Sequence, residues 1–125
     1  MYDYDPAKSP NRNQWLAMEE PDRINLVRQY HETTSDSIEN PTAHYGLNVT
    51  VETQIALDTP LVRQALGRLR KQGLSRHDGI HAIGNVVAKH MQNLIRSQYD
   101  PARDPNDYYG EMLSELGVSD SRADS

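Results

Sequence analysis

The sequence predicts an all-α protein, a small bundle of four or five helices. Proline stands at the expected first position of several helices, where its missing N–H would be unpaired anyway. Apolar residues in the segments that follow repeat with a helical period, and no segment alternates convincingly with a period of two. The connections are also short. The proline-marked starts are Glu20-Pro21, Asn40-Pro41, Thr59-Pro60 and Asp104-Pro105.

The first two predicted helices span residues 21–32 and 41–57, separated by a polar loop. Asn40 is a good N-cap for the second of them, and Glu20 is a weaker one for the first. Both segments carry apolar residues three and four positions apart, as one buried helix face requires. These residues are Ile24, Val27 and Tyr30 in the first helix, and Leu47, Val51 and Ile55 in the second.

The third predicted helix spans residues 60–72 and ends at Gly73, which we expect in the left-handed cap conformation. The fourth begins after Ser75 and continues to about residue 98, with Asp78 at capping-box spacing from Ser75. The fifth spans residues 105–116. Their expected apolar faces are Leu61, Val62, Ala65, Leu66 and Leu69 in the third, Ile80, Ile83, Val87, Met91 and Leu94 in the fourth, and Tyr109, Met112, Leu113 and Leu116 in the fifth.

The length and composition favour one domain with a modest core. The chain has 125 residues, a formal net charge of -5 and no cysteine, which excludes disulfides and thiolate chemistry. We expect a flexible arm over residues 1–12, one helical domain over 13–117 and a flexible tail over 118–125. No apolar run approaches the roughly 20 residues of a membrane span, and no secretory signal is present. These features predict a cytoplasmic protein without a membrane partner.

Polar residues on two predicted helices form the candidate site. His44, Asn48 and Glu52 recur at four-residue spacing and form a ridge on one helix, whereas Gln54 points away from that ridge. His77 and His81 show the same spacing at the start of the fourth predicted helix. If the two helices pack face to face, all of these residues meet.

Such a cluster would suit a divalent metal ion. Two neutral imidazoles four residues apart can chelate zinc, with Glu52 and His44 as further ligands, and the same donors suit iron or manganese. Asn48 is a poor zinc ligand and is expected beside the metal or on a ligand, as are Gln54, Asp78 and Arg76. Arg76 could instead bind an anionic ligand. With a metal-bound water, hydrolysis is the expected chemistry, and Asp78 or Glu52 would be the base.

The same residues also support a structural interpretation. His44, Asn48, Glu52, His77 and His81 would then form a buried hydrogen-bond network that joins two helices. Asp78 already has a role at the helix start. The segment from His77 to His81 is a weak match to the metallopeptidase pattern His-Glu-x-x-His, because Asp78 is shorter than Glu and no strand is predicted to hold a peptide.

A basic stretch suggests a third hypothesis, nucleic-acid binding. No acidic residue occurs between Thr59 and His77, and the turn near Gly73 has helix-turn-helix spacing. The acidic net charge makes nucleic acid an unlikely partner. The cations are Arg63, Arg68, Arg70, Lys71 and Arg76. A homodimer is left open by Gly84 and by apolar positions on the last helix.

Residues 40–94 resemble a family of small uncharacterised bacterial proteins, a domain of unknown function. The family pattern is His-x-x-x-His-x-x-x-Glu-x-Gln, followed after a spacer by Arg-His-Glu-x-x-His-x-x-Gly. Asn48 replaces the middle histidine, and Asp78 replaces the second glutamate. The resemblance implies an all-helical bacterial protein without an assigned activity, whose polar positions act together. The matching residues are His44, Glu52, Gln54, Arg76, His77, His81 and Gly84.

Overall fold

The computed structural model describes residues 4–33 and 41–117, with their side chains except those of 31–33 and 41–44. The predicted all-α class is confirmed, and no strand occurs in the described ranges. The prediction of four or five helices was too low, because a short helix precedes the first proline-marked one. The described ranges contain six helices, which are α1 (Arg12–Ala17), α2 (Glu20–Thr33), α3 (Pro41–Ala56), α4 (Pro60–Lys71), α5 (Arg76–Ile95) and α6 (Pro105–Glu115).

Helix α1 has only six residues, too few to show a helical period in the sequence. Its first turn is capped by Asn11, whose side chain accepts a hydrogen bond of 3.0 Å from the Gln14 amide. Its last carbonyls are satisfied from another helix. Arg23 on α2 donates to the carbonyl oxygens of Trp15 and Leu16 at 2.9 and 3.2 Å. Helix α1 is therefore held by its neighbour as well as by its own hydrogen bonds.

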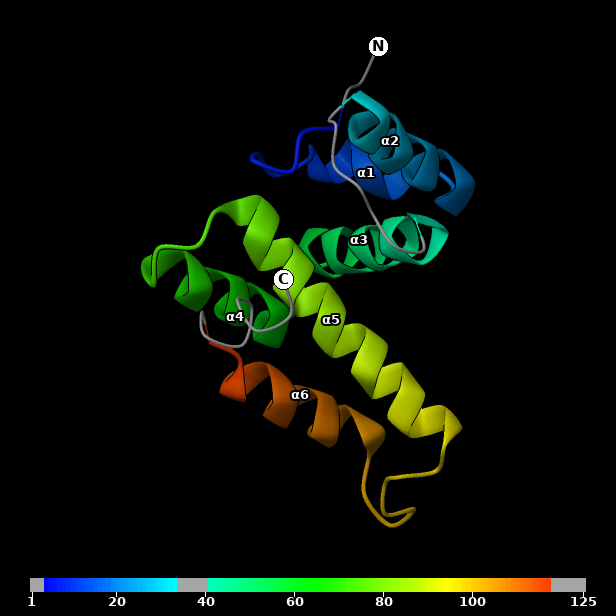
Figure 1. The fold of residues 1–125 in the computed structure, drawn as a ribbon, viewed down its shortest axis with the longest axis vertical. Helices are drawn as coiled ribbons and strands as arrows, with labels where there is room; N and C mark the ends of the chain where they lie inside the picture. Colours follow the sequence, from blue (N-terminus) through cyan, green and yellow to red (C-terminus); the bar gives the residue numbers. More distant parts are fainter. Residues whose placement is uncertain (1–3, 34–40, 118–125) are drawn as a thin grey trace.

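Helix α3 lies between two groups of helices (Figure 1). It contacts α1 and α2 on one side, and α4 and α5 on the other. Val51 and Ile55 belong to the main core with residues of α4, α5 and α6, whereas Val49 belongs to a second core with Trp15 and Val27. A helix that is buried on two faces must carry apolar residues on both. Helix α3 therefore joins the two cores.

The turn between α4 and α5 follows the sequence prediction. Gly73 has a φ of +100°, the left-handed region that favours glycine at the end of a helix. Ser75 caps α5, because its Oγ accepts a hydrogen bond of 3.1 Å from the Asp78 amide. Helix α5 then crosses α3 closely, since a Cβ added at Gly84 would lie 3.5 Å from the Cβ of Leu47.

Two expectations about burial differ from the structure. Residues 1–12 were expected to form a flexible arm, but Tyr4 is only 5% exposed and Pro6 is also buried. Met91 and Leu94 were expected on a buried face, but they are 51% and 43% exposed, because the apolar face of α5 extends beyond the buried core. The expected tail over 118–125 and the loop over 34–40 lie outside the described residues. In the described ranges, no helix combines the length and apolar character that crossing a bilayer requires.

Candidate functional site

A buried ion pair joins α3 to the start of α5. Arg76 donates two parallel hydrogen bonds to Glu52, from Nη1 to Oε2 at 2.8 Å and from Nη2 to Oε1 at 2.7 Å. The side chain of Glu52 is completely buried, and that of Arg76 is 6% exposed. This two-pronged geometry is the strongest form of an arginine–carboxylate pair. Glu52 of the α3 ridge and Arg76 at the start of α5 are therefore in direct contact, a question that the sequence left open.

The N-terminal segment closes this ion pair from the outside. The Tyr4 hydroxyl donates to Glu52 Oε2 at 2.6 Å, and Arg76 Nη1 donates to the carbonyl oxygen of Pro6 at 3.1 Å. Burial raises the pKa of Tyr4, and the adjacent Glu52 carboxylate raises it further. Burial lowers the pKa of Arg76, but its hydrogen bonds to Glu52 outweigh that effect and raise it overall. Tyr4 therefore stays a neutral donor, and Arg76 stays charged.

Two further candidate residues of α3, Asn48 and Gln54, have positions that suit a role in packing. Asn48 is 2% exposed and lies within the interior beside the second core. Gln54, which was predicted to point away from the ridge, accepts a hydrogen bond of 2.8 Å from the Tyr109 hydroxyl on α6. Burial raises the pKa of Tyr109 to about 12, and this hydrogen bond opposes the shift. Gln54 thus connects α3 to α6.

The candidate histidines take no part in the hydrogen bonds between Glu52 and Arg76. The ring of His77 meets Tyr30 of α2 edge-on, with ring centroids 5.9 Å apart. His81 is half-buried on α5, and Asp78 is exposed at the start of the same helix. His44 lies in α3, but its side chain is outside the described ones. Among the described side chains, no group of at least three His, Asp or Glu residues could hold a metal ion.

The predicted metal site fits the geometry of Glu52 poorly. Both carboxylate oxygens accept hydrogen bonds from Arg76, and one also accepts from Tyr4. The guanidinium is itself a cation at hydrogen-bond distance, so a metal ion on Glu52 would have to displace it. A zinc, iron or manganese site that includes His44, His77 and His81 stays a prediction. In the arrangement described, Glu52 is not positioned as a ligand of that metal site.

The ion pair is suited to holding the fold together. Glu52 has no exposed side-chain surface, so a reactant could not reach it without opening the N-terminal segment. Glu52 is hydrogen-bonded by Arg76 of α5 and by Tyr4, and Arg76 also donates to the Pro6 carbonyl oxygen, so the network joins segments far apart in the sequence. Sequence reasoning missed Tyr4 and Pro6. The available signal was an aromatic residue in an otherwise polar segment, which is a weak one.

Most of the basic stretch is engaged within the protein. Arg63 pairs with Asp58 at 2.8 Å, and Arg76 pairs with Glu52. Arg68 donates to the carbonyl oxygens of Leu113 and Leu116 at 2.6 and 3.1 Å, which caps the end of α6. These roles give the arginines structural reasons to be present. They weaken the argument for nucleic-acid binding, which needs cations that are free to meet phosphates.

An aromatic cluster closes the other end of the molecule, where α5 returns through a loop to α6. His90 stacks on Tyr109 with ring centroids 5.1 Å apart, and its Nδ1 lies 2.9 Å from the Tyr99 hydroxyl. Tyr99 in turn stacks on Tyr108 at 4.0 Å. His90 is half-buried in this cluster.

The His90 environment predicts acid sensitivity. Burial lowers the pKa of His90, so protonation is harder in the folded state than in the unfolded state. The stabilising contribution is present above the unfolded pKa of about 6.5 and is lost as pH falls through the lower folded pKa. We expect the difference in unfolding free energy between wild type and His90→Gln to fall from pH 7.5 to pH 5. Urea unfolding at both pH values measures it, and a constant difference would contradict the expectation.

Scans against protein-family models, curated proteins and solved structures give no match for this chain. The resemblance of residues 40–94 to an uncharacterised bacterial family therefore stays a prediction.

Proposed function

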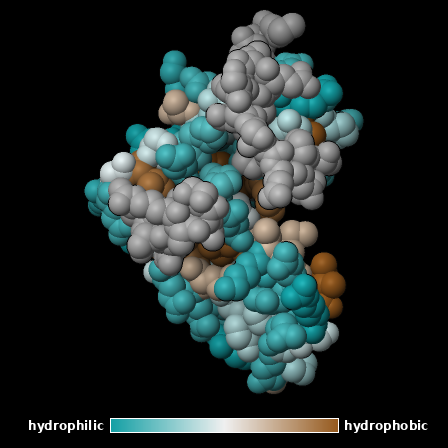
Figure 2. Space-filling model, viewed as in Figure 1, coloured by the Kyte–Doolittle hydropathy of each residue, from teal (hydrophilic) through white to brown (hydrophobic). Residues whose placement is uncertain are grey.

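We propose that this chain is a non-enzymatic interaction module that associates with a second copy of itself through α5. The observation that carries this proposal is the exposed apolar end of that helix. Met91, Leu94 and Ile95 are 51%, 43% and 80% exposed, in a protein of low overall hydropathy. Figure 2 shows hydrophobic surface at the right-hand edge of the lower half, over this part of α5. Exposed apolar clusters of this kind are typical of interaction sites.

The exposed residues continue a helix face that is buried further along the same helix. Ile83, Gly84 and Val87 on α5 are covered, and α3 crosses at Gly84. Met91, Leu94 and Ile95 follow at helical spacing, beyond that crossing. A second helix laid along them would extend the contact that α3 begins.

A second copy of α5 supplies such a helix. In a two-fold dimer the same patch is used by both subunits, so a short apolar stripe on one helix is complementary to itself when the helices run antiparallel. Two-fold dimers are also the commonest closed oligomers. The buried Tyr4–Glu52–Arg76 network supports this role, because it fixes α3 against α5 and so holds the patch on a firm scaffold.

The test is the mass of the protein in solution. Light scattering after size-exclusion chromatography is expected to show a dimer for the wild type and a monomer for Ile95→Glu. The added carboxylate would be buried without a partner in the dimer, which is strongly unfavourable. Ile95 is exposed in the single chain, so this variant should unfold at the same urea concentration as wild type once both are monomeric.

Leu57→Glu is the matched control. Leu57 is an exposed apolar residue of similar size to Ile95, with 57% of its surface exposed. It follows α3 and lies outside the α5 stripe of Met91, Leu94 and Ile95. This variant is expected to remain dimeric. A wild type that is monomeric at the highest concentration measured would overturn the proposal, as would an Ile95→Glu variant that still dimerises.

A further inference from the structure

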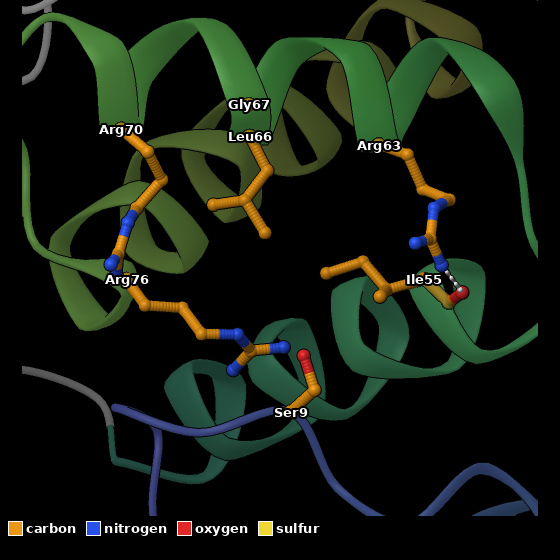
Figure 3. Close-up of a pocket in the computed structure, with 7 residues that line it drawn as sticks. All are labelled: Ser9, Ile55, Arg63, Leu66, Gly67, Arg70 and Arg76. Atoms are coloured by element: carbon orange, nitrogen blue, oxygen red, sulfur yellow. Dashed lines mark hydrogen bonds between the residues drawn. The ribbon is translucent and has the colours of Figure 1, made fainter.

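A small groove lies between α4 and the N-terminal segment, and its lining does not include Met91, Leu94 or Ile95 of α5. Figure 3 shows Arg63 and Arg70 projecting from α4 on either side of Leu66, with Arg76 and Ser9 facing them. Leu66 and Ile55 supply apolar surface, and the groove volume is about 260 Å³. That volume suits a small molecule of a few heavy atoms.

The charge of the groove is positive. Three of its lining residues are arginines, and none is acidic. Glu52 neutralises Arg76, and Asp58 is shared between Arg63 and Arg12, each at 2.8 Å. Arg70 makes no ion pair or side-chain hydrogen bond with the residues that the structure describes. The groove therefore has positive charge in excess of its acidic partners.

The donors that remain are suited to an oxyanion. The internal bonds of Arg63 use only its Nη1, which donates to Asp58 and to the Ile55 carbonyl oxygen. A guanidinium carries five N–H donors, so Arg63 and Arg70 both retain donors for a ligand. Ser9 adds a hydroxyl on the opposite wall. Arginine is well matched to phosphate and carboxylate groups, which accept paired hydrogen bonds.

A glycine in the groove wall is an independent observation. Gly67 is exposed in the interior of α4, where glycine is unfavourable relative to alanine because of its conformational freedom. Packing does not explain it, since a Cβ added at Gly67 would meet no atom within 4 Å. By contrast, a Cβ at Gly79 would lie 2.7 Å from Leu66. No neighbouring protein atom requires glycine at this position. A glycine here leaves space in the groove for a ligand that approaches the helix backbone.

We propose that this groove binds a small organic anion, a phosphate or carboxylate group on a short apolar body. The anionic group contacts Arg70 at one end of the groove, and the apolar body lies over Leu66 and Ile55 beside Gly67, toward Arg63 and Ser9. This site is independent of the proposed dimer, because it uses none of the α5 stripe residues.

Calorimetric titration of the full chain with butyl phosphate tests the site, with pentanoate, inorganic phosphate and butanol as further probes. We expect saturable binding of butyl phosphate or pentanoate, and the tighter of the two identifies the anionic group. Inorganic phosphate and butanol should each bind more weakly, since each lacks one part of the ligand. Arg70→Gln should weaken binding at least about tenfold, as expected for the loss of a charged hydrogen-bond donor.

Two other variants separate a built site from general charge attraction. Gly67→Leu fills the groove without meeting protein atoms at its Cβ, so it should abolish binding while the chain stays folded by circular dichroism. Lys71→Gln removes one neighbouring positive charge that does not line the groove, and it should bind as wild type does. The proposal is overturned if wild type shows no saturable binding, or if Gly67→Leu binds normally. Equal losses in Arg70→Gln and Lys71→Gln, or equal binding of inorganic and butyl phosphate, would indicate an adventitious ion only.

Discussion

Arg76→Met is expected to lower the unfolding free energy by about 3–5 kcal/mol, the usual cost of removing one partner of a buried ion pair. Methionine can replace much of the apolar part of the side chain, but it leaves the Glu52 carboxylate buried with only the Tyr4 hydroxyl. It also leaves the Pro6 carbonyl oxygen without its donor. The N-terminal segment should therefore loosen first.

The loss should depend on pH in a defined direction. Without Arg76, the folded variant buries a charged Glu52 carboxylate that has lost its cationic partner, and burying a neutral carboxyl group is less unfavourable than burying a charged one. The loss of unfolding free energy should therefore be larger at neutral pH than in acid. Urea unfolding of the variant and of wild type at several pH values measures this change.

Arg103→Met is the matched control, because it breaks an ion pair of the same length at the surface. Arg103 contacts Glu111 at 2.7 Å, but the two side chains are 41% and 57% exposed. Exposed pairs contribute about 0–1 kcal/mol, so this variant should differ little from wild type. If Arg76→Met and Arg103→Met lower the unfolding free energy equally, the buried ion pair does not stabilise the fold in the way that its burial and geometry indicate.

Trp15→Ala is expected to cost about 3–5 kcal/mol, the range for removing a large aromatic side chain from a core. Trp15 has no exposed surface, and its indole N–H donates to Thr53 Oγ1 of α3 at 3.0 Å. Its ring also lies 6.0 Å from that of Tyr4. The substitution removes the centre of the second core, which holds α1 and α2 on α3.

Circular dichroism should follow this unfolding, because Trp15 is the one tryptophan of the chain and the variant loses its fluorescence. Trp15→Phe is a graded comparison that keeps most of the apolar volume but loses the hydrogen bond, and its loss should be smaller. Leu57→Ala is an exposed control and should change stability by less than about 0.5 kcal/mol. A loss at Trp15→Ala no larger than at Leu57→Ala would contradict the described burial.

The wild-type tryptophan also reports whether the two cores unfold together. Its fluorescence follows the second core, whereas circular dichroism follows all helices. Because α3 belongs to both cores, we expect the two signals to change at the same urea concentration.

Much of the fold could be predicted from local signals. Proline at helix starts, Gly73 in its left-handed turn and Ser75 as a cap act within a few residues of themselves, so the sequence shows them directly. Helix α1 could not be found in this way, because six residues do not establish a period. The exposure of Met91 and Leu94 was also hidden, since a helical stripe shows which residues share a face but not where a neighbouring helix ends.

The candidate site was predictable in part. Spacing on one helix indicated Glu52, and Arg76 was a candidate because it lies next to the spaced histidines His77 and His81; the structure joins Glu52 to Arg76. Spacing alone did not show that Arg76 would take both oxygens of the carboxylate. It also did not show that Tyr4 and Pro6 would return to cover the pair, because contacts between positions 48 and 70 residues apart leave no local pattern.

These long-range contacts constrain the order of folding during synthesis. The partner of Glu52 is Arg76, so a nascent chain that has released only its first three helices would bury an uncompensated carboxylate if it closed its N-terminal segment. Tyr4 and Pro6 are made early, but we expect them to dock on Glu52 and Arg76 only after the start of α5 has left the ribosome. The first residues of this chain should then be among the last to reach their native positions.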